Sequence, residues 1–143
     1  MLNQLILAAL LLALTIAIHA AVLGAVLQRL DRQTVMQARG FASTTWLLVR
    51  VAAWVVLAHL LEIFAWGAFY AWRGVMPDLE IALYFSAVTY ATIGYGDVVP
   101  PQDWRLIAGV EGLTGILMCG WSGGFFFAVV NRIYEAREAQ GDR

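Results

Sequence analysis

Three long apolar stretches dominate the sequence and constrain its fold more than any other feature. They cover residues 2–27, 46–72 and 104–130, and polar side chains interrupt each of them only a few times. A helix that spans a bilayer needs about 20 predominantly apolar residues, so each stretch is long enough to cross a membrane. The composition agrees, because 62% of the residues are hydrophobic, whereas soluble domains average about 45–50%. We therefore predict an all-α integral membrane protein with three transmembrane helices.

The placement of arginine predicts how the chain is oriented, since cytoplasmic loops next to spanning helices are enriched in basic residues. Arg29, Arg32 and Arg39 follow the first stretch, and three more arginines follow the third. We therefore expect the N-terminus outside and the C-terminus in the cytoplasm. The first stretch has no basic residue before Arg29 and is too long for a secretory signal, which argues against cleavage. Residues 31–41 are expected to form either a short interfacial helix or a solvated loop.

The segment between the second and third stretches combines a short apolar helix with a glycine-interrupted loop. Asp78 follows Pro77 and is typical of a helix N-cap, which predicts a helix over residues 79–90. A helix of about 12 residues extends roughly 18 Å, too little to span a bilayer. The letters ATIGYGD follow at residues 91–97. Because non-helical backbone persists at membrane depth only inside protein or along a water-filled cavity, we predict a re-entrant loop that lines a pore.

The run TIGYGD at residues 92–97 resembles the selectivity filter of potassium channels. The resemblance extends over residues 46–130, and the chain looks like a small bacterial potassium channel subunit. It implies a homotetrameric pore that conducts K⁺ passively in the bacterial inner membrane, with no enzyme activity and no cofactor. The implied parts are an extra helix and cytoplasmic loop at 1–44, a pore domain at 45–131 and a cytoplasmic tail at 132–143. The expected partners are other copies of the chain and membrane lipids, with no nucleic acid.

The resemblance implies that backbone carbonyls replace the water shell of K⁺. The expected K⁺ ligands are the carbonyl oxygens of Thr92, Ile93, Gly94 and Tyr95 together with the Thr92 hydroxyl, and Gly96 belongs to the same filter. Successive carbonyls line one axis only if the backbone alternates in handedness. Gly94 and Gly96 allow this, because they adopt positive φ without a Cβ clash. Ile93 is β-branched, which favours extended backbone.

Side chains next to the filter are expected to support it. Asp97 places negative charge near the outer mouth of the pore. Many potassium channels carry a glutamate in the pore helix that bonds this aspartate, but Val88 stands at that position here. Tyr84, one turn earlier, is placed to supply a hydroxyl to Asp97 instead. We therefore expect Tyr84 and Asp97 to form a pair that supports the filter.

Glu111 is an acid inside a spanning helix, where a charged group is costly and usually functional. Its angle to the expected pore face points it toward the back of the pore helix, where it would bond Thr89, Tyr90 or backbone near Thr92 and support the filter. Glu62 lies at a similar depth, so the two acids are also placed to share a proton. The alternative is a solvated Glu111 with no role in gating.

The glycine-rich third stretch is expected to hold the gate. Gly115 and Gly120 resemble the hinge region of potassium channel inner helices, where the backbone changes during opening. The spacing places four residues on one helix face that resembles the pore-lining face: Ile116, Cys119, Gly123 and Phe127. Phe127 lies roughly 18 Å below Gly115 and either forms the cytoplasmic constriction or packs outward beside Phe125 and Phe126. Cys119 is interpreted as a small cavity wall rather than a reactive thiol.

His59 and Glu62 are spaced so that both lie on one face of the second helix. They supply two metal ligands with no second motif to complete a site, which favours a helix–helix hydrogen bond over a metal site. Three other functions stay open: a cation channel that also conducts sodium, a membrane enzyme built on His59 and Glu62, and a subunit that assembles without conducting. The run Gly94-Tyr95-Gly96 argues against the first of these.

Overall fold

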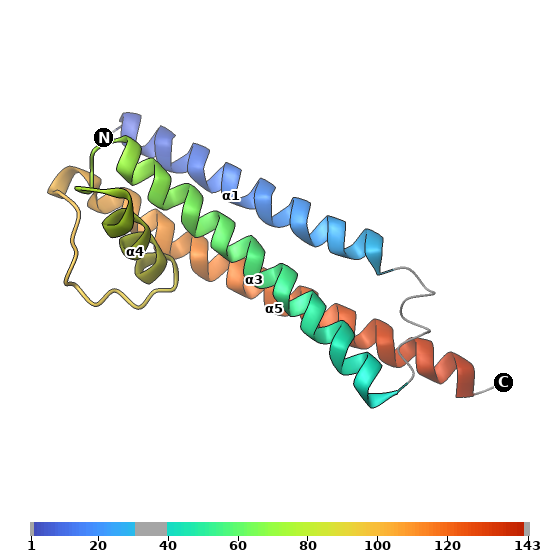
Figure 1. Ribbon diagram of the computed structural model, residues 1–143. Coiled ribbons are helices and arrows are strands. Elements are labelled where there is room, and N and C mark those ends of the chain that lie inside the picture. The colour runs from blue at the N-terminus through green and yellow to red at the C-terminus, as the bar shows by residue number, and fades with distance from the viewer. Residues whose placement is uncertain (1, 31–39, 142–143) are drawn as a thin grey trace.

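The computed structural model describes residues 2–30 and 40–141, which form a bundle of long helices (Figure 1). The elements in chain order are α1 at Leu2–Arg29, α3 at Phe41–Trp72, α4 at Leu79–Tyr90, the 3-10 turn η1 at Gln102–Trp104 and α5 at Arg105–Gly141. Three of the helices, α1, α3 and α5, contain segments long and apolar enough to cross a membrane. The described residues contain no strand, so the predicted all-α architecture is confirmed.

The predicted boundaries of α4 are confirmed, whereas those of the spanning helices are too short. Asp78 caps α4, because its carboxylate accepts a hydrogen bond of 2.8 Å from the Ile81 N–H. α3 begins at Phe41 instead of residue 46, and α5 continues to Gly141 instead of ending at residue 130. Apolarity sets where a helix crosses the bilayer, but polar residues continue the helix beyond it. Most of the expected helix or loop at 31–41 lies outside the described residues.

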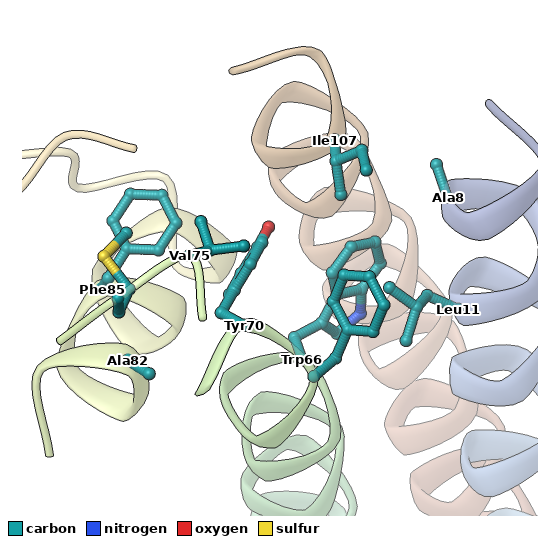
Figure 2. Packing of buried hydrophobic residues seen from close by; sticks show 10 residues of the cluster. Ala8, Leu11, Trp66, Tyr70, Val75, Ala82, Phe85 and Ile107 are labelled. Carbon is teal, nitrogen blue, oxygen red and sulfur yellow. The ribbon is translucent and has the colours of Figure 1, made fainter. Parts of the chain in front are cut away.

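α4 lies at one end of the bundle, beside the last turns of α3 (Figure 1). The N-terminus and the loop after α4 lie at this same end, whereas the C-terminus lies at the opposite end. A cluster of buried apolar side chains joins all four helices there (Figure 2). Its members are Ala8, Leu11, Trp66, Phe69, Tyr70, Val75, Met76, Ala82, Phe85 and Ile107. This core fixes α4 against the spanning helices.

α1 packs against α3 and α5 through a polar as well as an apolar face. Its buried residues recur every three or four positions, as expected for one face of a helix: Ala8, Leu11, Thr15, His19, Leu23 and Val26. The indole N–H of Trp66 on α3 donates to Thr15 Oγ1 at 3.0 Å, and the Thr15 hydroxyl donates to the Leu11 carbonyl at 2.9 Å. The Trp66–Thr15 bond fixes the register of α1 on α3, and the bond to Leu11 orients the Thr15 hydroxyl to accept it.

The backbone of α5 touches the C-terminal end of α4 at a glycine. A Cβ added to Gly115 would lie 1.9 Å from the carbonyl oxygen of Tyr90 and 3.2 Å from its Cα. Neither atom can turn away as a side chain can, so no larger residue fits. A similar contact joins α3 to α4, where a Cβ on Gly67 would lie 2.7 Å from Leu83 Cδ2. The two glycines let α4 lie directly on both helices.

Replacing Gly115 with alanine should lower the stability of the folded protein by about 1–3 kcal/mol, because the new methyl group overpacks against the Tyr90 backbone. The unfolding midpoint in detergent measures the change. Gly109→Ala on the same helix is the matched control, since a Cβ there meets nothing within 4 Å. An unchanged midpoint for Gly115→Ala would contradict the close contact.

Candidate functional site

The loop after α4 begins with a specific helix-ending arrangement. The Ile93 N–H donates to the Val88 carbonyl at 2.8 Å, and the Thr92 N–H donates to the Thr89 carbonyl at 2.9 Å. Paired bonds of this kind define a Schellman motif, in which the residue after the helix adopts left-handed backbone. Thr92 holds that position with φ of +59°. The Gly94 N–H also donates to Val88, at 3.1 Å, so the first residues of the loop are tied to the end of α4.

Backbone handedness alternates along the loop. Thr92, Gly94 and Gly96 have φ of +59°, +53° and +79°, and Thr92 is the one non-glycine residue with positive φ among those that the structure describes. The expectation of positive φ at Gly94 and Gly96 is therefore confirmed. Ile93 and Tyr95, which separate these three residues, do not have positive φ. Left-handed backbone therefore alternates with ordinary backbone along residues 92–96. Alternation of this kind is the condition that the sequence analysis set for successive carbonyls to line one axis.

Thr92 carries a backbone conformation that sequence reasoning missed. Left-handed backbone costs an L-residue roughly 1–2 kcal/mol, and a β-branched residue there is a clear outlier. Glycine would avoid this cost, so the presence of threonine indicates that its side chain is needed. Strained backbone of this kind concentrates at functional sites. Its sequence signal is weak, because the position is recognised only once the end of α4 is known.

The expected contact between Tyr84 and Asp97 is confirmed. The Tyr84 hydroxyl donates to Asp97 Oδ2 at 2.7 Å and links α4 to the outer end of the loop. Val88 stands where many potassium channels carry a glutamate, and it is buried at 8% exposure. Its apolar side chain therefore leaves no buried polar group without a partner at that position. Both Tyr84 and Asp97 are exposed in the single chain.

Glu111 faces α4, as expected, but its partners are not those predicted. It is fully buried. The Tyr70 hydroxyl donates to Glu111 Oε2 at 2.8 Å, and Ser86 Oγ lies 2.5 Å from Glu111 Oε1. The prediction named Thr89, Tyr90 or backbone near Thr92, which lie further along α4. The alternative of a solvated Glu111 is wrong, because the residue is fully buried. A proton shared between Glu111 and Glu62 is also not observed, because each acid has its own buried partners.

Ser86 extends this network to the backbone of α3. Its hydroxyl also lies 2.9 Å from the Ile63 carbonyl oxygen. A serine hydroxyl has one proton, and the carbonyl can only accept. Both contacts are therefore hydrogen bonds when the carboxyl of Glu111 donates to Ser86 and Ser86 donates to Ile63. The network ties α3, α4 and α5 together.

One face of α5 is left without partners in the single chain. The four residues expected to share a face, Ile116, Cys119, Gly123 and Phe127, are all exposed. Phe125 is buried in a cluster with α1 and α3, whereas Phe127 is 66% exposed and points elsewhere. Exposure of Phe127 in the single chain fits both the constriction and the outward-facing alternative, so its role stays a prediction. Gly120 also lies open, because a Cβ there would meet nothing within 4 Å.

Comparison with known proteins identifies the family. A family model described as "Ion channel" matches residues 45–132, which is more than half of the chain. The chain belongs to this ion channel family. The match begins within α3, includes α4 and the loop, and ends within α5, so the family segment contains every element of the site described above.

The channel is also similar to a curated protein, "Potassium voltage-gated channel protein Shal" of Drosophila melanogaster. The two are 30% identical in an alignment 92 residues long, which covers 61% of this chain and 16% of the fly protein. The channel therefore spans a small part of that relative. No solved structure matches the chain. The three apolar helices and the family together make this a membrane protein, and the family is one of channels rather than enzymes.

The hydrogen bond between Tyr84 and Asp97 also shifts the pKa of both side chains. The donated hydroxyl of Tyr84 is the main cause that lowers the pKa of the Asp97 carboxyl below its usual range, and it raises the pKa of Tyr84. Because the folded pKa of Asp97 is depressed, this contact stabilises the fold above the ordinary aspartate pKa of about 3.9. The stabilisation is lost as pH falls through the folded pKa.

Removing the Tyr84 hydroxyl should raise the pKa of Asp97 toward the ordinary aspartate value. A titration of the Asp97 carboxyl carbon by NMR, in the wild-type channel and in Tyr84→Phe, measures the shift. Tyr134→Phe is the control, because Tyr134 is an exposed tyrosine on α5 toward the other end of the bundle. Identical Asp97 titrations in wild type and Tyr84→Phe would show that the hydrogen bond has no effect on this carboxyl.

Proposed function

We propose that the chain is one subunit of a potassium-selective channel that conducts K⁺ passively through a homotetrameric pore. The membrane is the bacterial cytoplasmic membrane, with the N-terminus and the filter loop outside and the C-terminus inside. The arginines after α1 and after the apolar part of α5 support this orientation. The parts are an added helix and loop at 1–44, a pore domain at 45–131 and a tail at 132–143.

The alternating backbone at Thr92, Gly94 and Gly96 is the observation that carries this proposal. An ion that enters a narrow filter loses its water, and a column of carbonyl oxygens must replace that shell. The K⁺ ligands are the carbonyls of Thr92, Ile93, Gly94 and Tyr95 with the Thr92 hydroxyl. The need for this hydroxyl explains why a strained threonine occupies a position that suits glycine.

Exposure of the loop supports an assembly of several chains. Every residue from 91 to 97 is exposed in the single chain, including Ile93 at 53% and Tyr95 at 69%. Lipid cannot satisfy the polar groups of such non-helical backbone, so protein or a water-filled cavity must surround it. Other copies of the same chain supply that surrounding, and a closed ring places the loops around one axis. Four copies give a filter of the potassium channel kind.

The position of α4 supports a cation as the permeating ion. Its C-terminal residue Tyr90 rests on Gly115, which lies ten residues after Arg105 and so about 15 Å along α5. α4 therefore enters the membrane with its C-terminal end deepest. A helix C-terminus carries about half a negative charge, and four such ends around the axis attract a cation below the filter. The name of the fly relative supports potassium as that cation.

The exposed face of α5 supports a gate at its inner end. Gly115 and Gly120 form the hinge region, and Phe127 forms the apolar constriction on the cytoplasmic side. Phe127 is exposed on the same face as Ile116, where it is free to meet its copies across the axis. Apolar constrictions of this kind close a pore by excluding water. The filter is supported at its outer end by Asp97 and Tyr84, and from behind α4 by Glu111.

Potassium flux in liposomes tests the proposal with a matched pair of variants. Gly94→Ala should abolish selectivity for K⁺ over Na⁺ or prevent assembly, because a Cβ penalises the left-handed backbone of the filter. Gly74→Ala is the control, since Gly74 has φ of +64°, equally open surroundings and a position in the turn before α4. It bears the same backbone penalty and should keep K⁺ selectivity. A Gly94→Ala channel with wild-type selectivity would refute the filter assignment.

A further inference from the structure

A second buried polar cluster joins all four helices. Its members are His19 on α1, His59 and Glu62 on α3, Tyr90 at the end of α4 and Ser122 on α5. His19 and Glu62 are fully buried, and Ser122 and Tyr90 are nearly so. The predicted helix–helix hydrogen bond of His59 and Glu62 is present, but the pair has a third partner, His19, which the sequence analysis did not connect to it.

The two imidazole rings are arranged alike around the cluster. His19 Nδ1 lies 2.8 Å from Glu62 Oε1, and His59 Nδ1 lies 3.5 Å from Glu62 Oε2. The opposite nitrogens share one partner, because His19 Nε2 and His59 Nε2 lie 3.2 Å and 3.0 Å from Ser122 Oγ. Both rings therefore present Nδ1 to a carboxylate and Nε2 to one hydroxyl oxygen, which has two lone pairs to accept both N–H groups.

With Glu62 ionised and both imidazoles neutral, the cluster has fewer protons than contacts. Five contacts close a ring: His19–Glu62, Glu62–Tyr90, Tyr90–His59, His59–Ser122 and Ser122–His19. Two neutral imidazoles, one phenol and one hydroxyl supply four protons, and an ionised Glu62 supplies none. At least one contact then joins two acceptors. When both Nε2 atoms donate to Ser122, neither Nδ1 carries a proton: Nδ1 of His19 faces the carboxylate of Glu62, and Nδ1 of His59 faces Tyr90, whose hydroxyl donates to Glu62. A cation held by both Nδ1 atoms and the carboxylate resolves these contacts, as added protons would.

We propose that His19, His59 and Glu62 bind a divalent metal ion of the zinc class between α1 and α3. One donor atom from each residue lies within 4.8 Å of the other two. Zinc bonds to imidazole nitrogen and carboxylate oxygen are about 2.0–2.2 Å long, which places neighbouring ligand atoms of a tetrahedron about 3.4 Å apart. The distances from Glu62 to Nδ1 of His19, 2.8 Å, and to Nδ1 of His59, 3.5 Å, lie on either side of that value. Small movements of the side chains would therefore admit the ion.

The donor set and its surroundings select the metal. Two imidazoles and a carboxylate suit zinc, copper or nickel, whereas Mg²⁺ and Ca²⁺ prefer sites made of oxygen alone. Ser122 would accept the second N–H of both ligating rings, the role that outer partners of zinc-bound histidines usually have. The Tyr90 hydroxyl, 2.9 Å from His59 Nδ1, stands at the fourth position. Because Tyr90 ends α4, a bound ion would link α1 to the base of the loop.

Metal content of the full-length channel tests this proposal without reference to ion flux, so its outcome is independent of the proposed selectivity. The protein carries Cys119→Ser, which removes the exposed thiol as a competing ligand. After treatment with a chelator it is loaded with Zn²⁺, desalted in detergent and assayed for zinc. About one ion per chain is expected. Loading with Co²⁺ should give the visible absorption bands of tetrahedral coordination.

Three further variants locate the ion. His19→Gln should lose binding, although its amide can still hydrogen-bond to Glu62 and Ser122. Ser122→Ala should weaken binding by about 10–100-fold, as loss of an outer partner does. Glu111→Gln changes a buried carboxyl outside the cluster and should bind zinc as wild type does. A wild-type channel that retains no zinc would overturn the proposal. The side chains of the cluster would then be joined by hydrogen bonds alone. Wild-type zinc content in His19→Gln would also overturn it.

Discussion

The position of the loop after α4, the proposed filter, depends on one close contact between the C-terminal end of α4 and the middle of α5. The Tyr90 carbonyl lies so near Gly115 that any side chain there would collide with it. The loop leaves α4 within two residues of this contact, and the Schellman bonds to Val88 and Thr89 set its direction. A shift of α5 at Gly115 would therefore move the start of the filter. This gives the glycine a packing role in addition to its proposed role as a hinge.

Two buried polar networks surround that contact and act on different sides of α4. Glu111 binds Tyr70 and Ser86 behind the helix, and Glu62 binds His19 and Tyr90 near its end. Buried polar groups specify one arrangement of helices when every member has a partner. No buried side-chain nitrogen or oxygen in the described residues lacks one. α1 joins the second network through His19, so it is bonded to the helices of the family segment rather than packed beside them by apolar contacts alone.

Much of this structure follows from the sequence, because apolar length, an N-cap and a glycine pattern are local signals. They gave the three spanning helices, the bounds of α4, positive φ at Gly94 and Gly96 and the Tyr84–Asp97 pair. The misses concern contacts between distant segments. The angle of Glu111 was readable from helical periodicity, but its partners Ser86 and Tyr70 depend on how α4 sits in the bundle.

His19 shows the same limit. It interrupts the first apolar stretch on the helix's buried face, which was a readable signal, but its pairing with Glu62 spans 43 residues and no spacing rule predicts it. The left-handed Thr92 was missed for another reason, since β-branched residues disfavour that backbone. Local propensity fails there because the proposed need for a hydroxyl at the filter outweighs the strain.

The central claim is that carbonyls of Thr92, Ile93, Gly94 and Tyr95 from four chains enclose a column of potassium ions. Anomalous scattering from crystals of the channel grown with Tl⁺, a heavy substitute for K⁺, tests it most directly. Peaks stacked on a fourfold axis, level with these carbonyls, are the predicted result. Two results would contradict the account. One is clear density for the four chains with no Tl⁺ peaks along residues 92–95, and the other is an assembly in which the loop does not lie at the fourfold axis.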